Sequence, residues 1–523
     1  MRVKKISTLI LLLLSLSVLL QAQIYKPDPS IVEKIKNEGL NNSEIEELSF
    51  WLTDYAGPRL TASAGLDRGN DVAKKKMEEY GFKNVIIEEV RDFSRGGWDN
   101  LKTYVAMTSP YYAPFTANPI AWTGSTKGVI KDEVILVDIK SEEDFAKYRG
   151  KLKGKIVMLP SGAQYRVNFN PLARRYTDEE LQNMANPPAP RGEQAQRRPP
   201  QPDQQQAGDR MAQMSLRRQI TEFLVNEGVG VILNNSGSFN VPRSSGASYT
   251  MGDPEPICQV NLPVEAFGRM ERMLAHNVPV EMEIEIENKF NNTNKVYNVM
   301  GEIPGTDPKL KDEIVLLGGH YDAWHGSTGA ADNASGGIVM MEALRILNEL
   351  GIKPRRTIRV ALWGGEEQGL HGSRGYSEKY LMSPESGEKL DGFEKYQVYF
   401  NMDNGTGKFR GIYLQGNEEA IPLFEEWFKP FAEMGCSTIT LRNTGSTDHV
   451  TFDRMGLPGF QFIQDPIEYS RGYHTIMDTY ERLIMEDLMH NAVVVATMAY
   501  NAAMMDGKFP RKPMAEQTQQ DRR

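Results

Sequence analysis

Residues 312–367 read DEIVLLGGHYDAWHGSTGAADNASGGIVMMEALRILNELGIKPRRTIRVALWGGEE. The stretch opens with an apolar run that ends at His320, and it closes with a second apolar run at 356–365. Between the two runs, apolar residues recur at helical spacing, and Gly351 followed by Pro354 marks the end of that helix. The stretch therefore predicts a strand, a helix and a second strand in succession.

Strands that read as nearly continuous apolar runs are buried on both faces, so helices must cover the sheet on each side. The same rhythm continues in the strands VYNVMGEIPG (296–305), QVYFNM (397–402) and GFQFIQ (459–464), and in a closing helix over 486–504. The sequence predicts an α/β domain in which a mostly parallel sheet lies between two layers of helices.

A different pattern separates the first helices from this domain. Short β-like runs such as GKIVMLP and GVGVILNN predict a small β-rich domain from Thr123 to Phe290. It would divide the main domain into residues 23–122 and 291–510. A segment rich in Pro, Gln and Arg at 182–213 predicts a disordered loop, with a recognition arm as the alternative, and residues 511–523 form a polar tail.

The first 22 residues have the pattern of a secretory signal peptide. Basic residues precede an apolar run from Ile6 to Leu20, and the small residue Ala22 offers a cleavage site. The run is shorter than the roughly 20 residues of a membrane-spanning helix, and no later stretch approaches that length. We expect a secreted or periplasmic protein without a membrane span after cleavage.

Overall composition narrows the function further. The net charge of −9 argues against a nucleic-acid-binding surface. Two cysteines, Cys258 and Cys436, are too few for a disulfide framework, and we expect both to be free and buried. A GxSxG elbow, a P-loop and a catalytic cysteine motif are all missing from the sequence, which weakens serine, cysteine and nucleotide-dependent chemistry.

Candidate metal ligands follow successive predicted strands. In an open parallel sheet, ligands bind outside the carboxyl ends of the strands, so side chains far apart in sequence can converge there. Two histidines with several carboxylates suit a pair of borderline metals such as zinc. The candidates are His320, Asp322, Asp332, Glu366, Glu367, Asp403 and His474.

Each candidate also has a structural alternative. Asp332 could cap the following helix, and Glu366 with Glu367 could be a solvated surface pair. Asp403 could simply start a turn, and His474 could be a structural histidine. Of the other histidines, His325 and His449 are candidates for lining the pocket, whereas His276, His371 and His490 are expected to be structural.

Read together, the motifs HYD, GAADNASG, GGEEQG, NMDNG and YHTIMDT resemble those of the co-catalytic zinc exopeptidases. This family includes bacterial zinc aminopeptidases and plasma glutamate carboxypeptidases. GPRLTAS at 57–63 and NVMGEIPG at 298–305 extend the resemblance over most of the chain. The resemblance implies a zinc exopeptidase fold and identifies the β-rich insertion as a protease-associated domain.

The resemblance also implies a role for each candidate and two Zn²⁺ per chain. His320 and Asp403 would hold one metal, Glu367 and His474 the other, and Asp332 would bridge the two metals. Glu366 would act as general base and Asp322 would orient His320. The family often has an acidic residue where this chain has Ala331, which leaves the bridging ligand unchanged.

The implied function is a secreted exopeptidase that acts on peptide substrates, and an aminopeptidase is favoured. The alternatives are a carboxypeptidase or dipeptidase, a non-catalytic receptor-like binding protein, and an acyl transferase of the glutaminyl cyclase kind. The end of the peptide that is recognised depends on whether an acidic or a basic group meets it. The sequence leaves that group and the oligomeric state open, a homodimer included.

Overall fold

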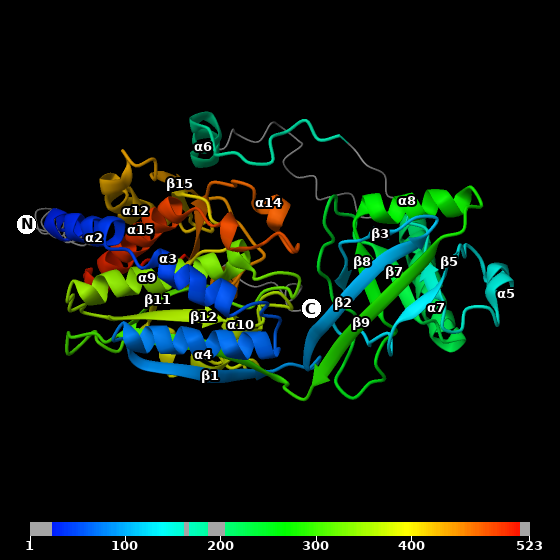
Figure 1. Ribbon diagram of the computed structural model, residues 1–523. Coiled ribbons are helices and arrows are strands. Elements are labelled where there is room, and N and C mark those ends of the chain that lie inside the picture. Colours follow the sequence, from blue (N-terminus) through cyan, green and yellow to red (C-terminus); the bar gives the residue numbers. More distant parts are fainter. Residues whose placement is uncertain (1–23, 162–166, 187–203, 513–523) are drawn as a thin grey trace, which may run out of the picture.

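The computed structural model describes residues 24–161, 167–186 and 204–512, and Figure 1 shows them as two units side by side. The larger unit, called here the catalytic unit, is built on an eight-stranded sheet in the described part of the chain. Its strands run in the order β1 (Lys83–Asp92), β10 (Lys295–Ile303), β12 (Thr357–Trp363), β11 (Ile314–His320), β13 (Tyr396–Asn401), β16 (Gly459–Gln464), β14 (Phe409–Tyr413) and β15 (Thr438–Thr440).

The centre of this sheet is parallel. Strands β12, β11, β13 and β16 pair in parallel. Toward the edges, β10 is antiparallel to both β1 and β12, and β14 is antiparallel to β16 but parallel to β15. The mostly parallel α/β sheet predicted from the sequence is confirmed. Because the central strands share one direction, their carboxyl ends open at a single edge of the sheet.

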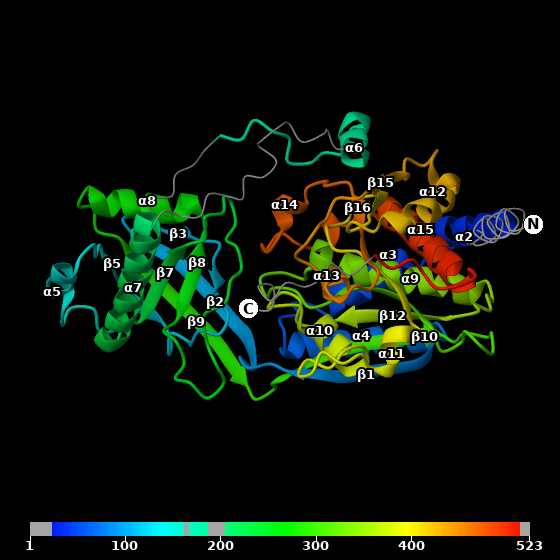
Figure 2. The same ribbon diagram turned by 180° about the vertical axis from the view of Figure 1, so that it is seen from behind.

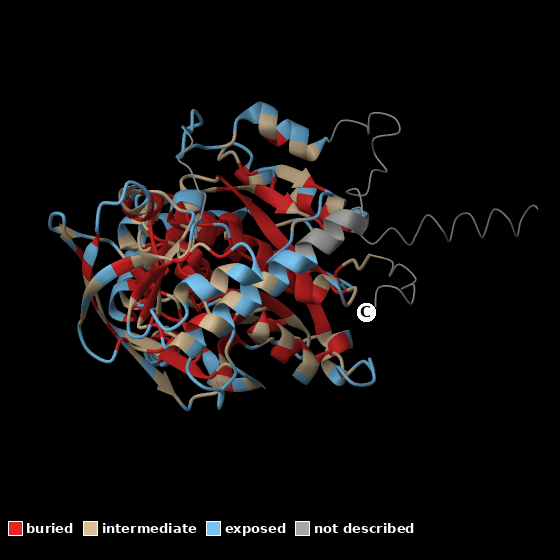
Figure 3. Cartoon of the chain, turned by 90° about the vertical axis from the view of Figure 1, so that its right-hand side faces the viewer, coloured by how far each residue is buried: buried red, intermediate tan, exposed pale blue. Residues whose placement is uncertain are grey.

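Helices cover both faces of the sheet (Figures 1 and 2). Along β11, Val315 and Leu317 enter the larger core, while Leu316 enters the smaller core on the opposite face, as alternation along a strand requires. Figure 3 shows the buried residues concentrated along the strands and the helix faces that meet them. The larger core packs under α2 (Pro29–Asn41), α3 (Ile45–Phe50), α4 (Ala64–Glu79), α9 (Ser335–Glu349) and α15 (Met485–Met504), and the smaller under α10 (His371–Tyr380), α11 (Asp391–Lys395) and α13 (His449–Asp453).

The second unit, called here the inserted unit, has its own eight-stranded sheet and its own core in the described residues. The strand order is β3 (Ala113–Pro114), β2 (Gly97–Ser109), β9 (Glu281–Asn291), β5 (Ile130–Leu136), β6 (Ile156–Met158), β7 (Val231–Asn235), β8 (Gln259–Leu262) and β4 (Asn118–Pro119). Helices α7 (Gln204–Glu227) and α8 (Val264–Ala275) accompany it.

The boundary of this unit differs from the expected Thr123. Strand β2 pairs with β9 from Gly97 opposite Asn291 to Ser109 opposite Glu281, so the sheet already begins at Gly97. The pairing joins segments far apart in the chain, and the apolar pattern around β2 alone does not reveal its partner. Residues 97–122 therefore belong to the inserted unit and not to the catalytic unit.

Two short connections and one long segment join the units. Strand β1 leads into β2 and β9 leads into β10 side by side, where the Phe93 N–H donates to the Asn294 carbonyl at 2.7 Å. A third connection leaves the inserted unit and places α6 (Asp178–Ala185) over the catalytic unit beside β15, as Figure 2 shows. We call residues 167–186 the crossing segment.

Several expectations fall at the limits of the described residues. The signal peptide, residues 187–203 of the polar segment and most of the tail lie outside them. Helix α6 continues to Ala185 and α7 begins at Gln204, so both ends of the segment expected to be a disordered loop are helical. At the start of the tail, Arg511 donates to the carbonyls of Phe393 and Tyr396, which fixes it to the catalytic unit.

Two further expectations can be compared with the structure. Cys258 and Cys436 are both free and buried, as predicted. Within the described residues, every helix is too short or too polar to cross a membrane.

Candidate metal centre

Five of the predicted ligands converge at the carboxyl edge of the central strands. His320 is the last residue of β11, and Asp403 follows β13. Glu367 follows β12 in the next loop, Asp332 lies in the π-helical turn η4 (Ala330–Ala334) before α9, and His474 follows α14 (Tyr469–Gly472). Parallel pairing of β11 with β12 and β13 brings these strand ends to one place.

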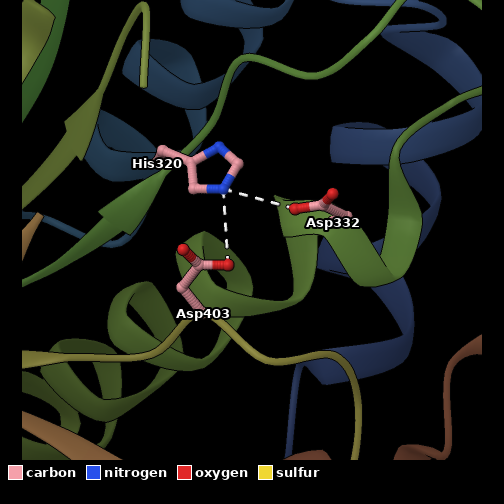
Figure 4. Close-up of side chains that lie close together, drawn as sticks. All are labelled: His320, Asp332 and Asp403. Carbon is pink, nitrogen blue, oxygen red and sulfur yellow. Dashed lines mark ion pairs between the residues drawn. The ribbon is translucent and has the colours of Figure 1, made fainter. Parts of the chain in front are cut away.

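The five side chains form two groups that share one carboxylate. His320 Nε2 lies 3.4 Å from Asp332 Oδ1 and 3.5 Å from Asp403 Oδ1, as drawn in Figure 4. His474 Nε2 lies 3.3 Å from Asp332 Oδ2 and 2.9 Å from Glu367 Oε2. Within each group the possible ligand atoms lie within 4.8 Å of one another. Asp332 thus presents one oxygen to each group, which is the arrangement that a bridging carboxylate needs.

The structural alternatives for these residues do not fit the geometry. Helix α9 begins at Ser335, and it is the side chain of Asn333 that accepts the Gly336 N–H at 3.2 Å, so Asp332 is not its cap. Glu366 and Glu367 are not a solvated pair, because their side chains are only 11% and 5% exposed.

Asp322 contacts both His320 and the two glutamates. Its backbone carbonyl lies 3.0 Å from His320 Nδ1, while its carboxylate is 3.7 Å from that atom. The carboxylate instead accepts the N–H groups of Glu366 at 3.0 Å and Glu367 at 3.2 Å. The carbonyl therefore leaves His320 Nε2 free toward Asp332 and Asp403, and the carboxylate positions the two glutamates.

Asp478 holds the backbone of the loop that carries the shared carboxylate of Asp332. Its two oxygens accept the N–H groups of Ala331 at 2.6 Å and Asp332 at 2.9 Å. Arg59, fully buried, donates to the carbonyls of Tyr321 and Gly329 on either side of the same loop. Asp478 and Arg59 both lie in motifs noted in the sequence, but their contacts to this loop were not predicted.

The electrostatics of the cluster indicate a missing positive charge. Burial raises the pKa of Glu367 to about 8, with the Asp332 charge adding to it. Burial also raises the pKa of Glu366 well above its usual value, with Asp403 and Asp448 adding. For His474, burial lowers the pKa, but Asp332 and Glu367 outweigh it and raise the pKa to about 9. Several carboxylates gathered in a dry site are stabilised by cations.

The residues present fit a pair of divalent metal ions. Glu367 Oε1 is buried and has no hydrogen-bond partner among the described residues. Such an atom is costly unless a ligand satisfies it. Two histidines and three carboxylates, one of them shared, form the donor set expected for zinc.

The centre opens into a cleft of about 620 Å³ between the two units. The catalytic unit contributes Glu366, Glu367 and His474, and the inserted unit and its connection contribute a facing wall. That wall includes Arg95, Ser244 and Ser245, which no motif in the sequence had placed here.

The other histidines lie away from both ligand groups. His325 Nε2 contacts the Pro119 carbonyl at 2.7 Å, and His449 Nε2 contacts the Thr444 carbonyl at 3.2 Å. In the motif GSTDH it is the neighbouring Asp448, fully buried and without a hydrogen-bond partner among the described residues, whose charge reaches the centre. Neither His325 nor His449 is among the described residues that line the cleft, so the expected lining role is not borne out.

The fold and the centre together define the class of a metal-dependent α/β hydrolase. Residues 298–499 match the family model described as Peptidase family M28.

The chain is similar to human carboxypeptidase Q, with 24% identity over 90% of this chain and 87% of that protein. It is 32% identical to aminopeptidase YwaD of Bacillus subtilis over 38% of this chain and 42% of that protein.

Solved structures share the fold. A peptidase M28 precursor from Shewanella amazonensis has a TM-score of 0.64 at 22% identity, covering 93% of this chain and 99% of its own. A zinc aminopeptidase from Bacillus subtilis has a TM-score of 0.54 at 20% identity, covering 88% of this chain and 94% of its own.

Proposed function

We propose that this chain is an exported two-zinc exopeptidase that hydrolyses the terminal peptide bond of its substrates. The observation that carries the proposal is Asp332, whose two oxygens face two separate His–carboxylate groups. The match of residues 298–499 to the family M28 model and the similarity to a carboxypeptidase and to an aminopeptidase support an exopeptidase. The apolar run near the N-terminus supports export to the periplasm or the medium.

His320 and Asp403 would hold one zinc ion, and Glu367 and His474 the other, with Asp332 shared between them. When bound, such a pair of ions lowers the pKa of a water molecule and polarises the scissile carbonyl. Asp322 and Asp478 keep this set in register, because their carboxylates hold the backbone on either side of it.

Glu366 is placed to move the proton. Its carboxylate lines the cleft and lies 4.0 Å from His320 Nε2, close to the ligand set but outside both ligand groups. Burial raises its pKa, which makes it a better base near neutral pH. Glu366 would accept a proton from the attacking water and return it to the departing amine.

The substitution Glu366→Gln tests this function. The variant should keep two zinc ions per chain by elemental analysis, because no ligand is changed, and its turnover of peptides should fall by about 10² to 10⁴-fold. Glu385→Gln, in an exposed turn, is the control and should behave as wild type. Near-normal turnover by Glu366→Gln would refute the proton-transfer role, and a wild-type protein without zinc would refute the enzyme.

A further inference from the structure

An arginine without an acidic partner faces the proposed metal centre. Arg95 lies in the short connection between β1 and β2 and lines the same cleft as Glu366, Glu367 and His474. Its guanidinium lies over the Trp122 ring, 4.9 Å from the ring centroid, and Nη1 donates to the Ala247 carbonyl at 3.3 Å.

These two contacts hold the guanidinium without neutralising it. Burial lowers the pKa of Arg95, and no carboxylate of the described residues pairs with its guanidinium. A half-buried guanidinium is costly to leave unpaired. It has five N–H donors, and its remaining donors are arranged to bind a carboxylate in a bidentate manner.

Two serines extend the donor set on the same wall. Ser244 Oγ accepts from Asn118 Nδ2 at 2.8 Å, and Ser245 Oγ accepts from Asn261 Nδ2 at 2.9 Å. Neither hydroxyl donates a hydrogen bond to another described residue, so its hydrogen is available for a further acceptor. Arg95 and both serines line the cleft, so the wall offers donors and a positive charge.

This wall is fixed relative to the catalytic residues. The Ser244 N–H donates to the His474 carbonyl at 2.7 Å, and Arg243 forms a β-bridge with Thr475. The donors therefore sit next to the proposed ligand His474 and line the same cleft.

Among the described residues that line the cleft, no spare carboxylate is present to pair with a free amine. Among the described residues that line it, the carboxylates are Glu366 and Glu367, and both already have roles at the centre. A further acidic group would favour a terminal amine, whereas the arginine that is present favours a carboxylate, because charge-assisted hydrogen bonds are the stronger ones.

We infer that Arg95, with Ser244 and Ser245, binds the terminal carboxylate of the substrate, so that the chain cleaves dipeptides or other short peptides next to their carboxyl end. The inference rests on the proposed function and specifies its substrate class. It favours the carboxypeptidase or dipeptidase alternative over the aminopeptidase.

Three matched substrates test it with the zinc-loaded full chain: Ala-Leu, Ala-Leu amide and N-acetyl-Ala-Leu. Wild type should hydrolyse Ala-Leu with a kcat/KM about 10- to 100-fold above that for the amide, the range expected for a charge-assisted hydrogen-bond set. The opposite result, in which amidation is harmless, would overturn the inference.

Arg95→Met should remove most of that preference by lowering kcat/KM for Ala-Leu and leaving the value for the amide almost unchanged. Arg95→Lys should restore part of it, because the charge returns without the bidentate geometry. Arg218→Met, an 83%-exposed arginine on α7 of the inserted unit, is the matched control and should keep the wild-type ratio. An unchanged ratio in Arg95→Met would also overturn the inference.

Binding provides a readout independent of turnover. In the zinc-loaded Glu366→Gln background, calorimetry should show Ala-Leu binding about 10- to 100-fold tighter than its amide, and Arg95→Met should abolish the difference. If wild type binds zinc but hydrolyses none of the three peptides, the proposed function fails. Equal binding of acid and amide would refute the carboxylate site even if hydrolysis is observed. Should Arg95→Met not fold, Ser245→Ala and Arg95→Lys test the same difference.

Discussion

At the scale of single residues, the proposed metal centre depends on carboxylates that are not themselves metal ligands. Asp322 organises the Glu366–Glu367 turn, and Asp478 organises the loop that carries Asp332. Each uses two oxygens to accept two backbone N–H groups. Such partners commonly matter almost as much for metal affinity as the ligands do.

Asp478→Asn should weaken zinc binding without unfolding the chain. One carboxylate oxygen would become an NH₂ group facing a backbone N–H, so Asp332 would lose one of its constraints. We expect a 10- to 100-fold lower zinc affinity in competition with a chelator. Glu481→Gln, an exposed neighbour, should bind zinc as wild type does. An Asp478→Asn variant with normal affinity would show that the loop is held without this residue.

At the scale of elements, the catalytic unit contains a helix, α15, that is buried on all sides. Helix α15 is buried from Asp487 to Ala503 with few breaks, because it packs against α9 on one side and α2 on another. A helix that is apolar on all sides suits such a position. His490 lies in this helix and is only 3% exposed.

His490 should make the fold less stable in acid. Burial lowers its pKa to about 3, so the unfolded chain binds a proton below about pH 6.5 while the folded chain does not. Stability is therefore lost as the pH falls from about 6.5 toward 3, by about 2 kcal/mol at pH 5 from this residue.

In His490→Leu, the drop in the free energy of unfolding between pH 7 and pH 5 should be about 2 kcal/mol smaller than in wild type, measured by urea denaturation. His276→Leu, at the exposed end of α8, should leave the wild-type drop unchanged. A His490→Leu variant with the full drop would mean that the proton uptake occurs elsewhere.

At the scale of the whole molecule, the cleft exists because two units meet. The paired connections at 93–96 and 292–294 join them on one side, and the crossing segment joins them on the other. In the crossing segment, Arg175 Nη1 lies 2.9 Å from Asp465 and 2.7 Å from Asp487, both buried in the catalytic unit. These ion pairs anchor the crossing segment on the catalytic unit.

Arg175→Met should lower the free energy of unfolding by about 1–3 kcal/mol, because two buried carboxylates lose a partner. The neighbouring Arg174→Met is a matched control, since its partner Glu180 is 40% exposed whereas Asp465 and Asp487 are buried, and an exposed pair is worth about 0–1 kcal/mol. Thermal or urea denaturation of the two variants would compare them. If Arg175→Met and Arg174→Met unfold with the same free energy, the Arg175 ion pairs contribute no more to stability than the exposed Arg174 pair does.

The sequence by itself determined the catalytic sheet, its helical layers and the set of residues at the strand ends. These features follow from local patterns, because apolar runs of strand length and helical spacing are visible within a few residues of one another. His320, Asp332, Glu367, Asp403 and His474 could be selected because they follow those strands.

Only the tertiary structure decided how these residues are supported and what faces them. Strand β2 joined the inserted unit through its pairing with a partner far along the chain, which no local pattern specifies. The Asp322 carboxylate accepts the N–H groups of the two glutamates, and Arg95 lines the cleft, because contacts across the fold set where each side chain lies. The ligand set is local in origin, whereas the wall that would choose the substrate arises from long-range packing.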